Sequence, residues 1–467
     1  MVNETVNQLL SLLRYMTPAL IGTRYGISEQ SPIITTKYAS SQQSDSPKFQ
    51  VSAMKNTLIS FCLFAILTMT VFAQSPELPW DMEKLSQPPE YEWLDAEPTG
   101  DLDMPSIRSL LYRGEDYGGK ATQVFAYYAR PADVASQTEP RTKVPAVVLV
   151  HGGGGTAFRE WAELWAKRGY AAIAMDLAGY RPVEGQNAHD RQNRQRLPNG
   201  GPDQGDEEKF GSIDKPANQQ WPYHAIANVV RAHSLIRSFE EIDTQRTAVT
   251  GISWGGYLTC IAAGVDQRFS AAVPVYGCGF LQDNSAWLPR FEKMNDQQRD
   301  RWVTLWDPSQ YLPRVKLPIL FVNGTNDFAY PLDSYMKSFD AVPADAKQLC
   351  VTVNMPHGHP PGWAPPEIER FISQHLLGSE PLPRLGSPEL AGELIIVPVE
   401  GKQPVAAAQL HFTTDTSAIN QRKWTTQAAE VHEARITANT PPADTTAWFV
   451  TAQDARDATV STRIVFP

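Results

Sequence analysis

Apolar and polar positions in the middle of the chain follow two patterns that alternate. Short continuous apolar runs are typical of strands buried on both faces of a parallel sheet, and between them apolar residues recur at helical spacing. The expected strands are 144–150, 170–176, 247–250, 271–275, 318–322 and 348–354, and the expected helices are 159–168, 223–238, 257–264, 333–341 and 366–377. A hairpin of β-rich runs at 107–112 and 123–129 precedes them. This order predicts an α/β fold, with a mostly parallel sheet and helices on both faces.

Two stretches interrupt this alternation, and a third pattern follows it. Residues 181–221 are polar and lack periodicity, whereas 279–311 are rich in aromatic residues. Long irregular stretches in a compact domain are usually lids or binding loops, so we expect both to be cap insertions over the carboxyl ends of the strands. After a linker rich in Pro and Gly, alternating apolar positions predict strands at 394–399, 406–413, 431–436, 446–452 and 460–466. These strands would form a small β-sandwich over 388–467.

The amino-terminal part of the chain has the features of a secretory signal. Met54 and Lys55 are followed by an apolar run from Leu58 to Phe72 and by the small residue Ala73. A basic start, a short apolar core and small residues at the end are typical of a signal peptide, and the run is shorter than the roughly 20 residues that span a bilayer. We expect residues 54–73 to be a signal peptide, 1–53 an upstream extension outside the native gene, and 74–106 an extended lead-in. The mature protein would be secreted or periplasmic without stable membrane association; the alternative is a membrane-anchored protein.

Composition narrows the possible partners. The formal net charge is −10 and 42% of the residues are hydrophobic, which is ordinary for a globular protein. No basic face is evident, which argues against a nucleic-acid partner. Cys260, Cys278 and Cys350 follow the signal peptide, and their spacing indicates no metal site. The sequence leaves open whether Cys260 pairs with Cys278.

The strongest chemical signal is the segment Gly251–Gly256, which lies between an expected strand and an expected helix. It contains the Gly-x-Ser-x-Gly nucleophile elbow in the strand–turn–helix context that this motif requires. A serine on such a sharp turn projects its hydroxyl above the sheet, and flanking glycines let the neighbouring backbone pass without a clashing Cβ. Ser253 is therefore the expected nucleophile.

A second signal is the glycine run Gly152–Gly155, which follows His151 and the buried strand 144–150. Acyl transfer places negative charge on a carbonyl oxygen, and backbone N–H groups must already point at it. We expect the amide of Trp254 and that of Gly153 or Gly154 to form this oxyanion hole. The run lacks the Lys-Ser/Thr ending of a phosphate-binding loop, and His151 is expected to be structural.

A serine hydroxyl becomes an effective nucleophile only when a base removes its proton. In the expected fold, an acid and then a histidine follow the serine along the chain. Asp327 lies just after the strand 318–322 and is the candidate acid; Asp333 is the alternative, but it begins a helix and looks like its cap. His357 is the candidate base, and His359 is the alternative base.

Together, His151–Gly155, Gly251–Gly256, Asp327 and Met355–His359 resemble the α/β-hydrolase clan of dienelactone hydrolases, acetyl xylan esterases and the catalytic domains of prolyl oligopeptidases. The resemblance covers about residues 107–378, so a catalytic domain is expected at 107–380, and the C-terminal sandwich lies outside it. It looks closest to secreted bacterial esterases that act on side groups of plant or algal polysaccharides. Two features depart from the clan: a prolyl oligopeptidase would carry a large β-propeller before this domain, and dienelactone hydrolases usually have cysteine as the nucleophile.

The resemblance implies a serine hydrolase that cleaves carboxylic esters through an acyl-enzyme, acting on a small-molecule or polysaccharide ester as an acetyl xylan esterase does. Each step needs only protein groups and water, so no cofactor and no metal is expected. Trp287, Trp302 and Trp306 would either stack on sugar rings or form the apolar core of the second insertion. The alternatives are a serine peptidase or amidase of the same clan, and a catalytically inactive binding protein on this scaffold.

Overall fold

The structure is a computed structural model that describes residues 78–96, 105–132, 143–343, 347–401 and 403–467. The segment Pro76–Pro467 forms one compact unit. The expected signal peptide at 54–73 and the expected extension at 1–53 lie outside the described residues. Within the described ranges, every helix is too short or too polar to cross a membrane.

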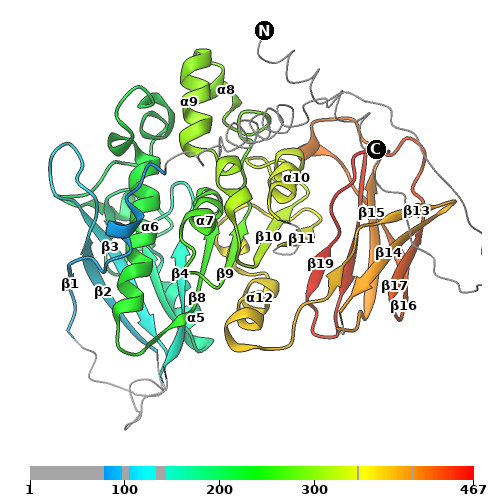
Figure 1. Ribbon diagram of the computed structural model, residues 1–467, viewed down its shortest axis with the longest axis horizontal. Coiled ribbons are helices and arrows are strands. Elements are labelled where there is room, and N and C mark those ends of the chain that lie inside the picture. Colours follow the sequence, from blue (N-terminus) through cyan, green and yellow to red (C-terminus); the bar gives the residue numbers. More distant parts are fainter. Residues whose placement is uncertain (1–77, 97–104, 133–142, 344–346, 402) are drawn as a thin grey trace, which may run out of the picture. The chain divides into compact units, whose positions relative to one another are not determined.

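Within the described residues, nine strands form the larger sheet (Figure 1). They are β1 (Tyr91–Trp93), β2 (Ser106–Arg113), β3 (Gln123–Arg130), β4 (Val144–Val150), β5 (Ala171–Met175), β8 (Ile242–Ile252), β9 (Ala271–Val275), β10 (Ile319–Gly324) and β11 (Lys347–Thr352). Their order is β1-β2-β3-β5-β4-β8-β9-β10-β11, antiparallel from β1 to β5 and parallel from there to β11. Strands β5, β9 and β10 are buried at every position, which explains why their sequences are apolar runs without alternation.

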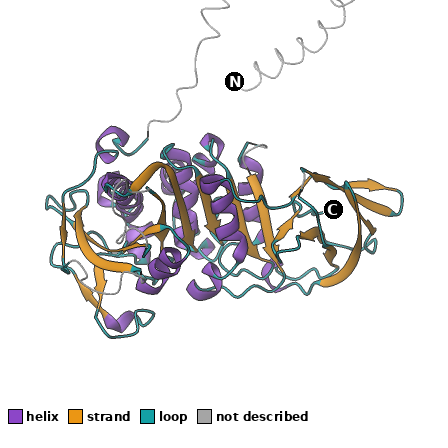
Figure 2. Cartoon of the chain, turned by 90° about the horizontal axis from the view of Figure 1, so that it is seen from below, coloured by secondary structure: helices purple, strands orange, loops and turns teal. Residues whose placement is uncertain are grey.

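Helices lie on both sides of the central strands (Figure 2). The longer ones are α5 (Arg159–Lys167), α6 (Trp221–Ser238), α7 (Trp254–Val265), α9 (Asp296–Trp306), α10 (Leu332–Ala341) and α12 (Pro366–Leu377), and the short ones are α3 (Met82–Leu85), α8 (Leu288–Phe291) and α11 (His359–Trp363). Helix α7 is buried at every position, because it packs on β8 and β9 and also against α6. The predicted mostly parallel α/β sheet with helices on both faces is confirmed.

The two irregular stretches contact each other. The first contains β6 (Tyr180–Pro182), β7 (Arg194–Arg196) and a one-turn π-helix (Glu207–Gly211), and the second contains α8 and α9. The Trp302 ring stacks on Phe210 with centroids 5.2 Å apart, and the indole of Trp306 donates to Gln220 Oε1 at 2.7 Å. Both tryptophans are completely buried. They therefore form an apolar core between the two stretches and offer no surface to a sugar ring.

In the described C-terminal residues, eight strands form an antiparallel, sandwich-like sheet, as predicted. They are β12 (Arg384–Leu385), β13 (Glu389–Ala391), β14 (Leu394–Glu400), β15 (Ala407–Thr413), β16 (Thr425–His432), β17 (Arg435–Asn439), β18 (Ala447–Gln453) and β19 (Thr459–Ser461). The strand predicted at 431–436 is wrong, because the chain turns at Glu433 and Ala434 between β16 and β17. Strand β16 is exposed at all but one position, so its sequence carries no alternation that could mark it.

Candidate active site

Ser253 occupies the sharp turn that joins β8 to α7. Its backbone has φ 59° and ψ −117°, a conformation that residues with a side chain rarely adopt. The turn is so tight that a Cβ on Gly251 would overlap the carbonyl of Gly255, and a Cβ on Gly255 would overlap the carbonyl of Val150. The glycines on either side of the serine are therefore required by close backbone packing, and they leave the Ser253 hydroxyl at the carboxyl end of the sheet.

The structure brings Ser253, His357 and Asp327 into one chain of hydrogen bonds. Ser253 Oγ lies 3.0 Å from His357 Nε2, and His357 Nδ1 lies 2.6 Å from Asp327 Oδ2. Asp327 follows β10 and His357 follows β11, so the carboxyl ends of neighbouring strands place both side chains beside the serine. Because the carboxylate accepts the Nδ1 proton, Nε2 is left to accept the proton of the serine hydroxyl.

Asp327 is itself held in place by the backbone that follows it. Its Oδ1 accepts hydrogen bonds from the amides of Ala329 at 2.9 Å and Tyr330 at 2.7 Å. One carboxylate oxygen is therefore fixed by the turn, and the other faces the imidazole. The ring of His357 is flanked by Tyr276, with centroids 4.4 Å apart, and by Phe328, with centroids 4.9 Å apart.

The two alternative residues have other partners. Asp333 lies in the first turn of α10, although Pro331 rather than Asp333 is the N-cap, and its carboxylate accepts from Asn284 Nδ2 at 2.9 Å. His359 begins α11, and its Nε2 accepts a hydrogen bond from the amide of Gly152 at 3.0 Å. Burial lowers the pKa of His359 to about 3, so this ring stays neutral near pH 7. The geometry thus favours His357 as the base and Asp327 as the acid.

The glycine loop packs directly against the residue that follows the serine. A Cβ on Gly153 would lie 2.8 Å from Cδ1 of Trp254, and Gly154 has a positive φ of 68°. The amide of Gly152 is engaged by His359, whereas the amides of Gly153, Gly154 and Trp254 donate no hydrogen bond within the part of the chain that the structure describes. These three N–H groups are available to a developing oxyanion.

His151 supports this loop from below, as expected. Its Nδ1 donates to the carbonyl of Gly152 at 2.7 Å, and its Nε2 accepts from the amide of Leu177 at 2.9 Å. Burial lowers the pKa of the ring, which keeps it in the neutral form that these two bonds need. His151 is therefore a structural residue of the loop.

Sequence reasoning missed three residues near the site. Arg194 Nη1 donates to the carbonyl of Gly155 at 2.7 Å, and the ammonium of Lys209 lies 4.6 Å from the centre of the Trp254 ring. Both come from the polar stretch 181–221, whose lack of periodicity gave no signal.

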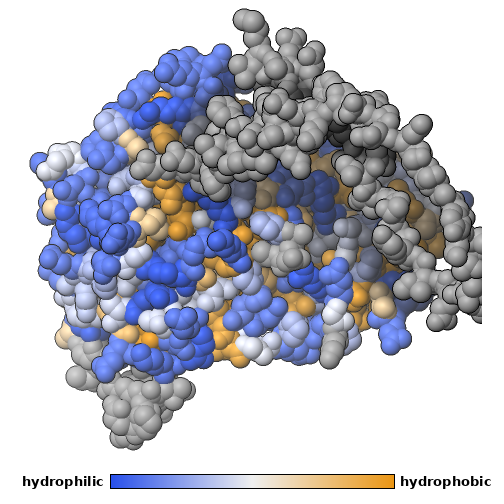
Figure 3. Space-filling view, viewed as in Figure 1, coloured by the Kyte–Doolittle hydropathy of each residue, from blue (hydrophilic) through white to orange (hydrophobic). Residues whose placement is uncertain are grey.

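The third residue is Phe328, which lies beside His357 and is 58% exposed. Scattered exposed hydrophobic residues are normal on a protein surface, and Figure 3 shows them between hydrophilic ones. The contact with His357 is what distinguishes Phe328.

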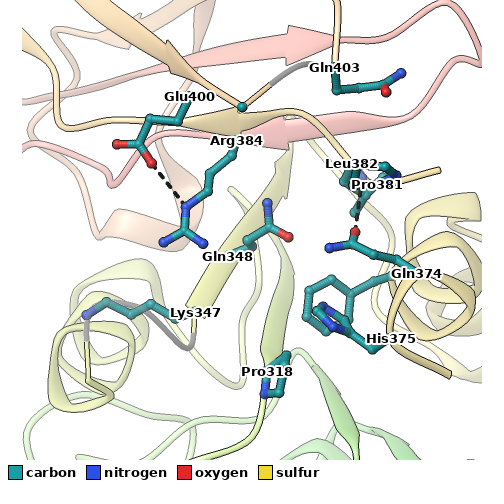
Figure 4. A pocket seen from close by; sticks show the side chains of 12 residues that line it. Pro318, Lys347, Gln348, Gln374, His375, Pro381, Leu382, Arg384, Glu400 and Gln403 are labelled. Carbon is teal, nitrogen blue, oxygen red and sulfur yellow. Dashed lines mark hydrogen bonds and ion pairs between the residues drawn. The ribbon is translucent and has the colours of Figure 1, made fainter. Parts of the chain in front are cut away.

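A separate pocket of about 190 Å³ lies at the amino ends of β10 and β11, where Pro318 and Lys347 line it (Figure 4). Several of its polar side chains already have partners: Arg384 pairs with Glu400 at 3.1 Å, and Gln348 Nε2 donates to the carbonyl of Pro383 at 3.1 Å. Because Ser253 and His357 lie at the carboxyl ends of the strands, this pocket is not part of the site.

The three buried cysteines take no part in the site. Cys260, Cys278 and Cys350 are free thiols, so Cys260 does not pair with Cys278. Burial raises the pKa of all three thiols, which makes them poor nucleophiles.

Comparison with known proteins links the chain to esterases. A family model described as acetyl xylan esterase (AXE1) matches residues 101–299, and one described as PhoPQ-activated pathogenicity-related protein matches 290–422. Acetyl esterase Axe7A of Xylanibacter ruminicola is 22% identical over 248 residues, which are 50% of this chain and 52% of that protein. Dipeptidyl aminopeptidase BIII of Pseudoxanthomonas mexicana is 26% identical over 309 residues, 58% of this chain and 38% of that protein. The chain thus spans about half or less of these curated relatives.

Among solved structures, an acetyl xylan esterase from Paenibacillus sp. R4 has a TM-score of 0.49 and 23% identity, covering 65% of this chain and 99% of that one. A structure from Klebsiella pneumoniae that is described as a putative dienelactone hydrolase has a TM-score of 0.35 and 20% identity, covering 54% of this chain and 88% of that one. The resemblance to acetyl xylan esterases and the wider α/β-hydrolase clan is confirmed by the family model and the curated relatives.

Proposed function

We propose that this protein is a serine ester hydrolase that removes acetyl or similar small acyl groups from a carbohydrate. The observation that carries the proposal is the hydrogen-bonded chain from Asp327 through His357 to the hydroxyl of Ser253, next to amides without a partner in the described structure. A nucleophile, a base, an orienting acid and oxyanion donors are the groups that acyl transfer requires.

In the proposed reaction, His357 Nε2 takes the hydroxyl proton as Ser253 Oγ attacks the ester carbonyl carbon. The amides of Trp254 and of Gly153 or Gly154 stabilise the oxyanion, and each such donor is worth about 10²–10³ in rate. The imidazolium, stabilised by Asp327, then gives its proton to the departing alkoxide, which leaves the acyl group on Ser253. Water gives a proton to His357 Nε2 as its oxygen attacks this acyl-enzyme, and His357 then returns the proton to Ser253 Oγ as the acid departs.

A carbohydrate alcohol is supported by one contact of the site and by the comparisons. The leaving alkoxide takes its proton from His357 Nε2, so the alcohol lies near this ring, and the exposed ring of Phe328 contacts the same imidazole with centroids 4.9 Å apart. A flat aromatic face suits the apolar C–H face of a sugar ring. Trp302 and Trp306 are buried and cannot serve in this way. The match to the acetyl xylan esterase model agrees with this substrate class.

A peptidase of the same clan is the second candidate, because the matched relatives include a dipeptidyl aminopeptidase. The test uses the purified full chain and its Ser253→Ala variant on p-nitrophenyl acetate, acetylated xylan and an aminoacyl p-nitroanilide. Serine-dependent acetate release from the first two supports the carbohydrate esterase. Release from the anilide alone supports the peptidase, and no serine-dependent hydrolysis of any of the three would support a binding protein.

The same proposal places the protein outside the cytoplasm, because residues 54–73 have the pattern of a signal peptide. Amino-terminal sequencing of the protein recovered from its native host tests this. A start at or near Gln74 is expected, and a start far upstream of Gln74 would contradict export through this segment.

A further inference from the structure

Lys209 is a cation that the proposed reaction does not use, and it contacts the tryptophan that follows the nucleophile. It belongs to the one-turn π-helix Glu207–Gly211, and the residue is only 7% exposed. Its Nζ lies 4.6 Å from the centre of the Trp254 ring and 5.7 Å from that of Trp221. Because Trp254 directly follows Ser253, this ammonium lies next to the residue whose amide is proposed to hold the oxyanion.

The charge of Lys209 is not neutralised by the described part of the chain, where its Nζ forms no ion pair and no hydrogen bond. Three carboxylates act on it from a distance: Asp203 pairs with Arg191 at 3.4 Å and Asp206 pairs with Arg290, and within the described residues Glu208 forms no ion pair with the ammonium. Two aromatic faces offset only part of the cost of removing an ammonium from water. Burial lowers the pKa of Lys209 to about 8, so the group is still mostly charged at pH 7.

A second cation, Arg194 of β7, contacts the glycine loop. Arg194 donates from Nη1 to the carbonyl of Gly155 at 2.7 Å and from Nη2 to that of Ala188 at 3.0 Å, but within the described ranges it has no carboxylate partner. The pKa of His151 under the loop is lowered mainly by burial and further by Arg194 and Lys209. Both positive charges therefore act on the segment that carries the oxyanion donors.

We infer that Lys209 and Arg194 form a subsite for a carboxylate on the ester substrate. The chain as a whole has a formal net charge of −10, which disfavours the approach of an anionic substrate. Two cations that form no ion pair with a carboxylate in the described residues, one at Trp254 and one at the glycine loop, would reverse this preference locally. A substrate carboxylate would supply the partner that they lack. The inference rests on the proposed ester hydrolysis and names its substrate class: esters of acidic sugars, with the charge on the alcohol, or half-esters of dicarboxylic acids, with the charge on the acyl group.

Two pairs of esters test the inference and locate the charge. The hemisuccinate and the pentanoate of 4-nitrophenol compare a charged with a neutral acyl group, and 3-acetoxybenzoate and phenyl acetate compare a charged with a neutral alcohol. We expect the wild type to have the higher kcat/KM for the charged member of at least one pair. Lys209→Met should lower kcat/KM for that ester about tenfold or more and for its neutral partner less than about threefold. Lys215→Met, an exposed lysine of the same stretch, is the matched control and should change neither.

The pH dependence of this preference gives a readout that needs no variant. The preference should be present below the Lys209 pKa of about 8 and should decrease as the pH rises through it. Burial is the main cause that lowers this pKa; the carboxylates of Asp203, Asp206 and Glu208 act to raise it, and Arg191 acts to lower it.

Three results would overturn the inference. Equal kcat/KM for both members of both pairs, with hydrolysis that still depends on Ser253, would overturn the subsite and leave the proposed function standing. An equal loss for charged and neutral esters in Lys209→Met would show that Lys209 only supports the fold. No hydrolysis of any of the four esters by the wild type would overturn the proposed function and the subsite together.

Discussion

Replacement of Asp327 by asparagine tests the proposed triad most directly, because the structure dictates how the new amide must lie. The amides of Ala329 and Tyr330 both donate to Oδ1 of Asp327, so the oxygen of an asparagine must take that position. The amide nitrogen then faces His357 Nδ1, which is 2.6 Å from Oδ2 in the wild type. An NH₂ group can only donate there, so Nδ1 must give up its proton, and the ring proton moves to Nε2, where it blocks proton transfer from Ser253.

The expected loss follows from two contributions. To accept the serine proton, the ring must carry its own proton on Nδ1 again. The Nδ1–H group and the asparagine NH₂ group would then be two buried donors facing each other, which costs about 1–3 kcal/mol. The imidazolium in the transition state would also lose its charge-assisted hydrogen bond, which is worth about 1.5–3 kcal/mol. The sum of about 2.5–6 kcal/mol corresponds to a fall in kcat of about 10²–10⁴.

The assay is kcat for p-nitrophenyl acetate hydrolysis, with thermal unfolding measured on the same samples. Asp333→Asn is the matched control, because Asp333 is the other aspartate of this region and contacts Asn284 rather than His357. It should keep kcat within about threefold of the wild type. A kcat of Asp327→Asn within tenfold of the wild type, in a folded protein, would refute the tautomer argument and the assignment of Asp327.

Three further predictions concern the loop, the rim of the site and stability. Gly153→Ala should lower kcat about tenfold or more, because its Cβ would meet Trp254 Cδ1 at 2.8 Å and displace the loop; unchanged steady-state kinetics would contradict this role. Phe328→Ala should raise KM for acetylated xylan severalfold but not for ethyl acetate, and equal effects on both would argue against sugar stacking. Burial lowers the pKa of His411 to about 4, so below about pH 6.5 the unfolded chain binds a proton that the folded chain does not, and stability falls as pH falls. Urea titrations at pH 7 and pH 5 measure this effect. The unfolding free energy of the wild type should fall by about 1–2 kcal/mol more between these pH values than that of His411→Gln, and equal falls would rule the explanation out.

The parts of the fold that could be predicted are those in which burial imposes a pattern. Strands β4 and β9 are buried on both faces, and their sequences are therefore uninterrupted apolar runs. Ser253, Asp327 and His357 could be proposed because each follows a strand, and the carboxyl ends of parallel strands meet at one edge of the sheet. By contrast, β16 is exposed at almost every position and left no such pattern.

The rest of the site depends on contacts that the sequence does not encode locally. His357 and His359 are two residues apart in one loop, and only the position of the Gly152 amide shows that His359 is engaged elsewhere. Likewise, Lys209 is placed by Trp254 and Arg194 by Gly155, partners more than thirty residues away in the chain. A polar stretch without periodicity gives no sign of which of its charges will contact the residues around the nucleophile.

The C-terminal sheet has a consequence for the solubility of the catalytic part. Strand β11 is the last strand of the larger sheet, and an uncovered edge strand offers backbone groups with which another chain can pair. Here β19 lies against it: the amide of Val351 donates to Ser461 Oγ at 2.8 Å, and Arg463 pairs with Asp340 at 2.7 Å. A side chain thus occupies the position that a neighbouring molecule's carbonyl would otherwise take. Cutting the gene before the C-terminal sheet would uncover this edge, and the shortened protein should self-associate even though Ser253, His357 and Asp327 are all retained.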